Sequence, residues 1–136
     1  MSLSAQQIHL VQESFAKVEP IAEQAAAIFY QQLFAIDPSL QKMFQHDMKA
    51  QGKMLMSTLK LAVGSLNDLP KLMPVLKKLA LRHVDYGVKN EHYTLVGNAL
   101  LRTLKIGLGD SFDDETREAW TTTYRLMAKV MKSATV

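Results

Sequence analysis

Hydrophobic residues recur along the chain at intervals of three and four positions, which is the spacing of one face of an α-helix. Ser4 and Gln7 have the spacing of a helix capping box and open the first such pattern. Its apolar positions are Ile8, Val11, Phe15 and Val18. Glu19 and Pro20 end this helix, and Pro20 suits the first turn of the next one. The sequence therefore predicts a first helix that begins just after Ser4.

The second helical pattern follows Pro20 and is interrupted by Pro38. Its apolar stripe consists of Ile21, Ala25, Ile28, Phe29, Leu33 and Ile36. Tyr30 lies beside the stripe. Asp37 and Pro38 then predict a helix cap followed by a first-turn proline, which open a short segment to residues 43–44. A polar stretch occupies residues 45–49.

Two longer helices are predicted in the middle of the chain. The first runs from about Ala50 and ends before residues 67–70; its apolar positions include Leu55, Leu59, Ala62, Val63 and Leu66. The second ends at Gly87, which sits where a helix closes with a left-handed cap. Its apolar face carries Val75, Leu76, Leu79, Ala80, His83 and Val84. A histidine on such a face must hydrogen-bond within the core or give a nitrogen to a ligand, and this pattern leaves both explanations open.

Two more helices complete the chain. One carries Tyr93, Val96, Leu100 and Leu104 and is stopped by Gly107 and Gly109. Asp113 or Asp114 caps the last helix, which turns Ala119, Trp120, Tyr124, Met127 and Met131 inward. No strand pattern, internal repeat or linker appears. We therefore expect an all-α chain of six longer helices and one short helix, in a single domain over residues 1–136.

Composition and charge narrow the possible functions. The chain has no cysteine, which excludes disulfides, thiolate nucleophiles and iron–sulfur clusters. Its net charge of +3 comes from scattered basic residues, so we do not expect nucleic-acid binding. The N-terminus lacks the pattern of a signal peptide, and no apolar run is long enough to span a membrane. We expect a cytoplasmic protein without a membrane span.

Several chemically distinctive residues follow one another in a set order. They are Tyr30 on the second helix, Phe44 after the short helix, Gln51 and Leu55 four positions apart on the next, and His83, which follows Gln51 by 32 positions. Each also has an ordinary structural explanation, as a core aromatic, a core leucine or a solvated amide. Together the set resembles the globin family, and closely its bacterial single-domain members and the haem domain of flavohaemoglobins. Neuroglobin-like proteins are also similar around His83.

The resemblance covers essentially the whole chain. It is strongest in residues 67–78 and in His83, Gly87-Val88, His92-Tyr93, Val96-Gly97 and Ala119-Trp120. It implies a globin fold around a haem b (iron protoporphyrin IX) pocket, with His83 as the proximal ligand of the iron. The pocket residues that it implies are Phe44, Gln51, Leu55, His83, Val88, Tyr93, Val96 and Leu100, with Met127 as a further apolar wall residue.

On the distal side, the resemblance gives Tyr30 and Gln51 the polar positions. A phenolic O–H directed at a bound dioxygen, which carries partial negative charge, stabilises it by hydrogen bonding. Gln51 would donate to the same ligand or hold the tyrosine hydroxyl. The resting sixth ligand stays open between water, Tyr30 and Gln51. His46 is either a neighbour of the haem propionates or a solvated loop residue, and Lys49, Lys53 and Arg82 are further propionate candidates.

One departure from the family pattern bears on function. Flavohaemoglobin-like globins hold the proximal histidine in a network with a tyrosine and a late glutamate. Tyr93 matches the tyrosine, but Glu118 is the last acidic residue of this chain. A carboxylate near the imidazole would push electron density onto the iron and favour O–O chemistry. Peroxidase-like chemistry is therefore not expected.

Four kinds of function remain open from the sequence. The leading one is reversible binding of dioxygen and other small ligands such as NO or CO at a pentacoordinate-capable iron. The second is nitric-oxide dioxygenation supported by a separate reductase, since no dinucleotide fingerprint is present. A haem-based gas sensor and a haem-free interaction module are further alternatives.

Overall fold

The computed structural model describes residues 3–43, 47–85 and 89–134, and within them all regular structure is helical. The helices in order are α1 (Ala5–Val18), α2 (Ala22–Ile36), α3 (Met48–Gly64), α4 (Leu69–Asp85), α5 (Asn90–Leu108) and α6 (Asp114–Ala134). Short 3₁₀ helices cover Glu19–Ile21, Pro38–Met43 and Gly109–Ser111. The predicted all-α class and the six longer helices are confirmed, and the predicted short helix is the 3₁₀ segment at Pro38–Met43.

Side-chain caps begin several helices where the sequence predicted them. Ser4 and Gln7 form the expected capping box at α1. The Asp113 carboxylate accepts the backbone N–H of Thr116, which makes Asp113, and not Asp114, the cap of α6. Asp47 caps α3, so that helix begins slightly before the predicted Ala50. The hydrogen bonds to Asp113 hold the pKa of its carboxyl below the ordinary value.

Two boundaries differ from the sequence prediction. Pro20 lies in the 3₁₀ turn Glu19–Ile21, and α2 begins only after it. Gly107 does not stop α5, which continues to Leu108 because Gly109 provides the terminating positive φ of 58°. Pro74 lies inside α4, where its missing N–H removes one backbone hydrogen bond without ending the helix. The predicted cap Gly87 falls outside the described residues.

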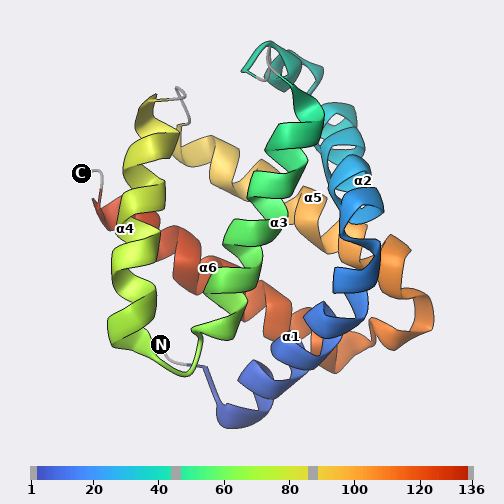
Figure 1. Cartoon of the computed structure of the whole chain (residues 1–136), viewed down its shortest axis with the longest axis vertical. Helices are drawn as coiled ribbons and strands as arrows, with labels where there is room; N and C mark the ends of the chain where they lie inside the picture. The colour runs from blue at the N-terminus through green and yellow to red at the C-terminus, as the bar shows by residue number, and fades with distance from the viewer. Residues whose placement is uncertain (1–2, 44–46, 86–88, 135–136) are drawn as a thin grey trace.

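The helices cross in pairs around a common core (Figure 1). α2 packs on α5 and α3, whereas α6 packs on α1 and α4. α3 and α4 are joined by the short connection at residues 65–68 and contact each other much less than each contacts its main partner. The arrangement leaves α4 with α6 on one side of the core and α3 with α2 on the other.

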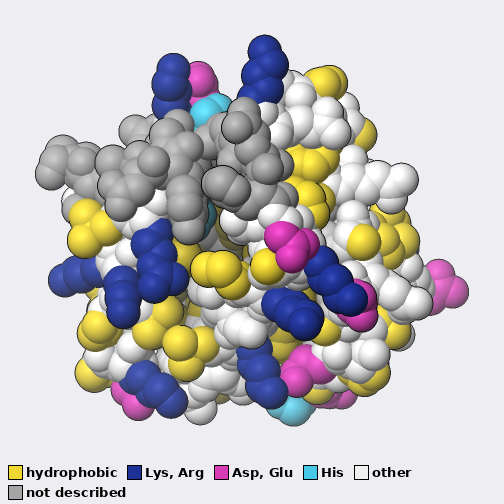
Figure 2. Space-filling view, turned by 45° about the horizontal axis from the view of Figure 1, so that its top comes forward, with side chains coloured by type: hydrophobic (Ala, Val, Ile, Leu, Met, Phe, Trp, Pro, Cys, Tyr) yellow, Lys and Arg dark blue, Asp and Glu magenta, His cyan; other side chains and the backbone are white. Residues whose placement is uncertain are grey.

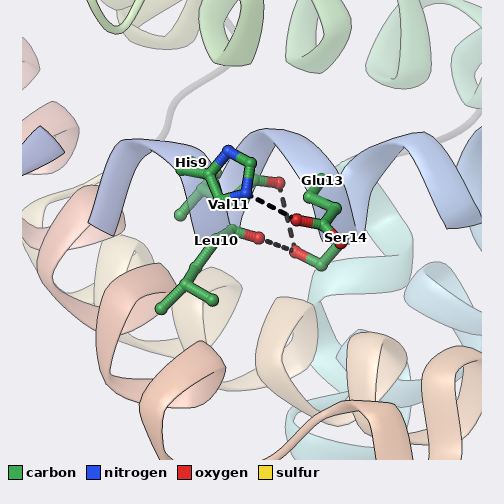
Figure 3. A network of polar contacts seen from close by, with 5 residues as sticks. All are labelled: His9, Leu10, Val11, Glu13 and Ser14. Atoms are coloured by element: carbon green, nitrogen blue, oxygen red, sulfur yellow. Dashed lines mark hydrogen bonds and ion pairs between the residues drawn. The ribbon is translucent and has the colours of Figure 1, made fainter. Parts of the chain in front are cut away.

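A polar contact inside the core joins α1 to α6. The fully buried indole of Trp120 donates its N–H to the Ser14 hydroxyl oxygen at 2.8 Å. The Ser14 hydroxyl is in turn 2.6 Å from the Leu10 carbonyl oxygen and 3.1 Å from that of Val11 (Figure 3). On the outer side of the same helix, His9 and Glu13 form an exposed ion pair (Figure 3). The inner network satisfies a buried indole N–H that would otherwise destabilise the core.

The described part of the chain contains no helix that is both long and apolar enough to cross a bilayer.

Candidate functional site

His83 lies near the end of α4, on the helix face predicted to point inward. Its Nδ1 is 2.8 Å from the carbonyl oxygen of Leu79, one turn earlier. A carbonyl oxygen only accepts, so Nδ1 carries the proton and the neutral ring has its lone pair on Nε2. Partial burial lowers the pKa of the imidazole, which favours this neutral form. Such a histidine can donate an electron pair to a metal ion through Nε2.

Tyr93, on α5, stacks against His83. The two ring centroids are 6.2 Å apart and the ring planes differ by 21°. Tyr93 is only 7% exposed, and burial raises the pKa of its hydroxyl. Its backbone carbonyl accepts the hydroxyl of Tyr124, from α6, at 2.6 Å. His83, near the end of α4, and Tyr93, near the start of α5, therefore lie together, and the middle of α6 contacts Tyr93 through Tyr124.

Tyr30 and Gln51 come together where α2 crosses α3. The Tyr30 side chain is only 8% exposed, although the sequence placed it beside the apolar stripe. Its hydroxyl is 3.5 Å from the backbone carbonyl oxygen of Gln51, a long and weak hydrogen bond. The contact is made to the main chain of Gln51, whereas the sequence suggested the amide side chain as the partner.

Small residues permit this crossing. A Cβ added to Gly52 would lie 3.0 Å from the Cβ of Ala26, closer than side-chain carbons ordinarily approach. The glycine next to Gln51 therefore lets α3 approach α2 closely at this point. The backbone of Gln51 reaches the Tyr30 hydroxyl because of this close approach.

Two of the predicted apolar wall residues line one small apolar cavity. Leu55 and Leu100 face it from α3 and α5, and its volume is about 20 Å³. The remaining lining includes Phe15, Val18, Ala25, Phe29, Met56 and Leu59. Its one polar neighbour, Thr103, donates its hydroxyl to the Ala99 carbonyl, so the cavity offers little to hold a water molecule. Val96 is half-buried and Met127 is buried in the core.

The predicted site residues thus form two groups. One group is the His83–Tyr93 pair between α4 and α5, and the other is Tyr30, Gln51 and the leucines between α2, α3 and α5. The helix α5 belongs to both groups. Phe44, Val88 and His46 lie outside the described residues.

The other described histidines, His9 and His92, and the propionate candidates lie at or near the surface. Lys49, Lys53 and Arg82 are exposed, and Lys49 forms an ion pair with Glu23 at 3.7 Å. Figure 2 shows lysine and arginine side chains standing out around hydrophobic ones on the face that it views. His9 is exposed, and His92 accepts the backbone N–H of Lys89 at the start of α5, where it caps the helix.

Sequence reasoning missed three contributors to this arrangement. Gly52 and Gly97 each allow a close approach; a Cβ on Gly97 would lie 2.7 Å from the Tyr124 ring. Glycines inside helical patterns, where alanine would be a better helix former, were the available signal. Lys132 of α6 places its ammonium 5.6 Å from the centroid of the Tyr93 ring. No spacing rule along one helix predicts that contact.

Helices throughout the described residues, a histidine ligand candidate on α4 and a buried tyrosine on α2 agree with what the comparisons find. A family model described as Globin matches residues 27–131. The chain belongs to the globin family. It is similar to a solved bacterial globin from Campylobacter jejuni, with a TM-score of 0.84 and 27% identity over 96% of this chain and 95% of that one.

Curated relatives have a longer chain. The chain is 31% identical to a flavohemoprotein of Chromobacterium violaceum over 95% of its own length and 33% of the relative. It is 34% identical to a flavohemoprotein of Oceanobacillus iheyensis over 87% of its length and 30% of that relative. The chain spans about a third of the length of these flavohemoproteins.

Proposed function

We propose that this chain, as one globin domain over residues 1–136, holds haem b and reversibly binds dioxygen and other diatomic ligands. Haem, when bound, supplies an iron centre at which such gases coordinate. The observation that carries the proposal is the hydrogen bond from His83 Nδ1–H to the Leu79 carbonyl. It orients the imidazole and leaves the lone pair on Nε2, as in axial histidine ligands.

The other residues of the site would hold the cofactor and its gas ligand. Tyr93 stacks on the His83 ring and would help to orient it. Leu55, Leu100 and Val96 would present an apolar wall to the porphyrin, with Phe44 and Val88 as predicted additions. Tyr30 would donate its hydroxyl to the gas ligand in place of its weak contact with Gln51, and the Gln51 side chain would support it.

Haem reconstitution tests this proposal. We expect the purified chain to take up haem and give a Soret band, and His83→Ala to change the ferric and ferrous spectra. His9→Ala is the matched control, because His9 is an exposed histidine paired only with Glu13. A chain with no Soret band after haem addition, or a His83→Ala spectrum identical to the parent, would overturn the proposal.

Replacing Tyr30 tests the distal half of the site. A hydrogen bond to a partly charged ligand contributes about 1–3 kcal/mol, so Tyr30→Phe should release dioxygen roughly 5- to 150-fold faster. Stopped-flow measurement of dissociation gives the rate. Carbon monoxide carries much less charge on its oxygen, so its release should change far less and serves as the control. Equal effects on the two gases would contradict the role of the hydroxyl.

A second candidate is nitric-oxide dioxygenation with a separate reductase, suggested by the likeness to flavohemoproteins. The buried Tyr30 hydroxyl beside Gln51 supports a site that retains dioxygen. The test is consumption of nitric oxide by the haem-loaded chain with a cellular reductase. Consumption that stops after one equivalent argues for a binding protein, and sustained consumption argues for the enzyme. A gas-sensing role and the cytoplasmic location stay predictions.

A further inference from the structure

The helices α3 and α4 carry the positive charge of the chain. Together they have seven basic residues and one acidic residue, which gives them a formal charge of +6. The rest of the sequence has nine basic and twelve acidic residues and a formal charge of −3. All seven basic side chains of the two helices are exposed. The charge of the molecule is therefore asymmetric, and the outer surface of α3 and α4 is its basic side.

Exposed hydrophobic side chains gather on the same two helices. Among the described residues, five large hydrophobic side chains are exposed, and four of them, with exposed fractions of 45–58%, lie on α3 and α4: Met54, Leu61, Leu69 and Leu81. Each of the four has a lysine or arginine one or two positions away in the sequence. We call the exposed side chains of α3 and α4 the α3–α4 face.

The two helices form one continuous side of the molecule. In Figure 1 they lie side by side in front of α6. Figure 2 shows lysine and arginine side chains among hydrophobic ones over the left and centre of the view, where Figure 1 places α4 and α3. Lys49 and Lys60 form ion pairs with Glu23 at 3.7 Å and Glu19 at 3.3 Å. Both pairs are exposed and therefore weak, so these lysines can exchange their partners for another anionic group.

The composition of the α3–α4 face favours a lipid surface over a protein partner. Interfaces between proteins are enriched in aromatic residues and arginine and depleted in lysine. The two helices contain no phenylalanine, tyrosine or tryptophan, and six of their seven basic residues are lysines. Lysine can lay its aliphatic stem along apolar surroundings while its ammonium reaches a phosphate. Leucine and methionine beside lysine is the pattern of helices that lie in the interface of a bilayer.

We propose that the α3–α4 face binds the surface of an anionic lipid bilayer. The basic side chains contact the headgroup phosphates, and Leu81 and the other exposed apolar side chains enter the boundary between headgroups and acyl chains. The two helices lie along the bilayer surface. The inference goes beyond the proposed function and does not depend on it, because the face consists of side chains that point away from the candidate haem site.

Sedimentation of the haem-loaded chain with lipid vesicles tests the electrostatic part. We expect binding to vesicles of equal parts phosphatidylcholine and phosphatidylglycerol and little binding to phosphatidylcholine alone. Each basic side chain near an anionic surface strengthens binding about fivefold, so Lys77→Gln with Lys78→Gln should lower the partition coefficient about 25-fold.

The matched control removes the same charge from another helix. Arg117 and Arg125 are exposed on α6, which lies behind α3 and α4 in Figure 1. Arg117→Gln with Arg125→Gln should change the partition coefficient by less than about twofold at physiological salt, because charges away from the contact are screened. If the double lysine variant does not fold, Lys71→Gln alone should give about a fivefold loss.

A fluorophore on the face tests the apolar part. The chain has no cysteine, so Leu81→Cys offers a single site for a nitrobenzoxadiazole label, whose emission moves to shorter wavelength in apolar surroundings. We expect this shift with the mixed vesicles. The control is Ile106→Cys, at a residue of α5 that is exposed to a similar degree, where no shift should occur. Polyglutamate and duplex DNA, which are anionic without an apolar interior, should not shift the label at position 81.

Three outcomes would overturn the proposal. The first is a chain that does not bind the mixed vesicles. The second is an equal loss of binding in the two double variants, which shows a general attraction of a basic protein. The third is a label at position 81 that shifts with polyglutamate or DNA as much as with vesicles, which makes an acidic protein or a nucleic acid the occupant. A chain that takes up no haem can be measured in the same way, so failure of the proposed function is distinguishable from failure of this inference.

Discussion

At the scale of single residues, hydrogen bonds to backbone carbonyls determine which atom of an inward-facing side chain donates and which one accepts. The bond to the Leu79 carbonyl determines which nitrogen of His83 carries the proton. In the same way, the Ser14 hydroxyl contacts carbonyl oxygens of its own helix and offers its oxygen to the indole of Trp120. The sequence identified His83 and Trp120 as inward-facing residues. It did not identify the partner of Trp120, because that contact joins positions 106 residues apart.

Ser14→Ala should destabilise the fold by about 1–3 kcal/mol, because it leaves the buried indole N–H of Trp120 without its acceptor. Chemical denaturation followed by tryptophan fluorescence measures the change. Glu13→Ala, one position away in an exposed ion pair, should cost less than about 0.5 kcal/mol. Equal losses in the two variants would show that the internal contact contributes nothing specific.

At the scale of helices, caps and close approaches decide where each element begins and how near it lies to its neighbour. The caps were predictable, since Ser4, Asp113 and Gly109 act through residues within one turn. The close approaches between helices could not be predicted from the sequence. Gly52 and Gly97 carry no local signal that distinguishes them from Gly64, which has open space around it.

Gly97→Ala should therefore destabilise the chain, although alanine forms helices better than glycine. The new methyl group would lie 2.7 Å from the Tyr124 ring and displace it, at a cost of about 1–3 kcal/mol. Gly64→Ala, at the end of α3, should instead stabilise by about 0.5–1 kcal/mol. Urea denaturation of both variants tests the prediction, and a stabilised Gly97→Ala would contradict the packing argument.

The Asp113 cap gives the last helix a pH dependence. The pKa of this carboxyl is lowered in the folded chain by its bonds to Thr116, so the charged form stabilises α6. Its contribution is complete above the ordinary Asp pKa of about 3.9 and is lost as the pH falls through the lowered value.

The stability difference between the parent and Asp113→Ala should therefore be largest near neutral pH and shrink in acid. Thermal unfolding at a series of pH values measures it. Asp113→Asn, which can cap without titrating, should stay close to the parent at neutral pH and lose less stability in acid. A parent-to-alanine difference that does not change with pH would contradict the role of the charged cap.

At the scale of the whole molecule, the fold separates two pairs of helices and connects them through α5. This helix carries Tyr93 of the proximal group and Leu100 of the cavity wall. A cofactor held between the groups would bind the folded chain and not the unfolded one. Binding and folding would then be linked.

Haem should therefore raise the melting temperature in a concentration-dependent way. At a free haem concentration 100 times Kd, the expected gain is about 2.7 kcal/mol. Circular dichroism of the chain with and without haem measures the shift. His83→Ala should lose a large part of it and His9→Ala should keep it. An equal gain in the parent and His83→Ala would place haem binding outside this site.

The sequence by itself determined the helices, most of their limits and the inward-facing residues. These depend on the 3.6-residue repeat and on caps that act within one turn. It also supplied the order of residues that indicated the globin family. Only the tertiary structure decided that Tyr30 is buried against the backbone of Gln51, that Gly52 brings α3 to Ala26, and that Lys132 sits on Tyr93. These contacts join residues far apart in the chain, and they depend on how helices cross and which side chains fill the space between them.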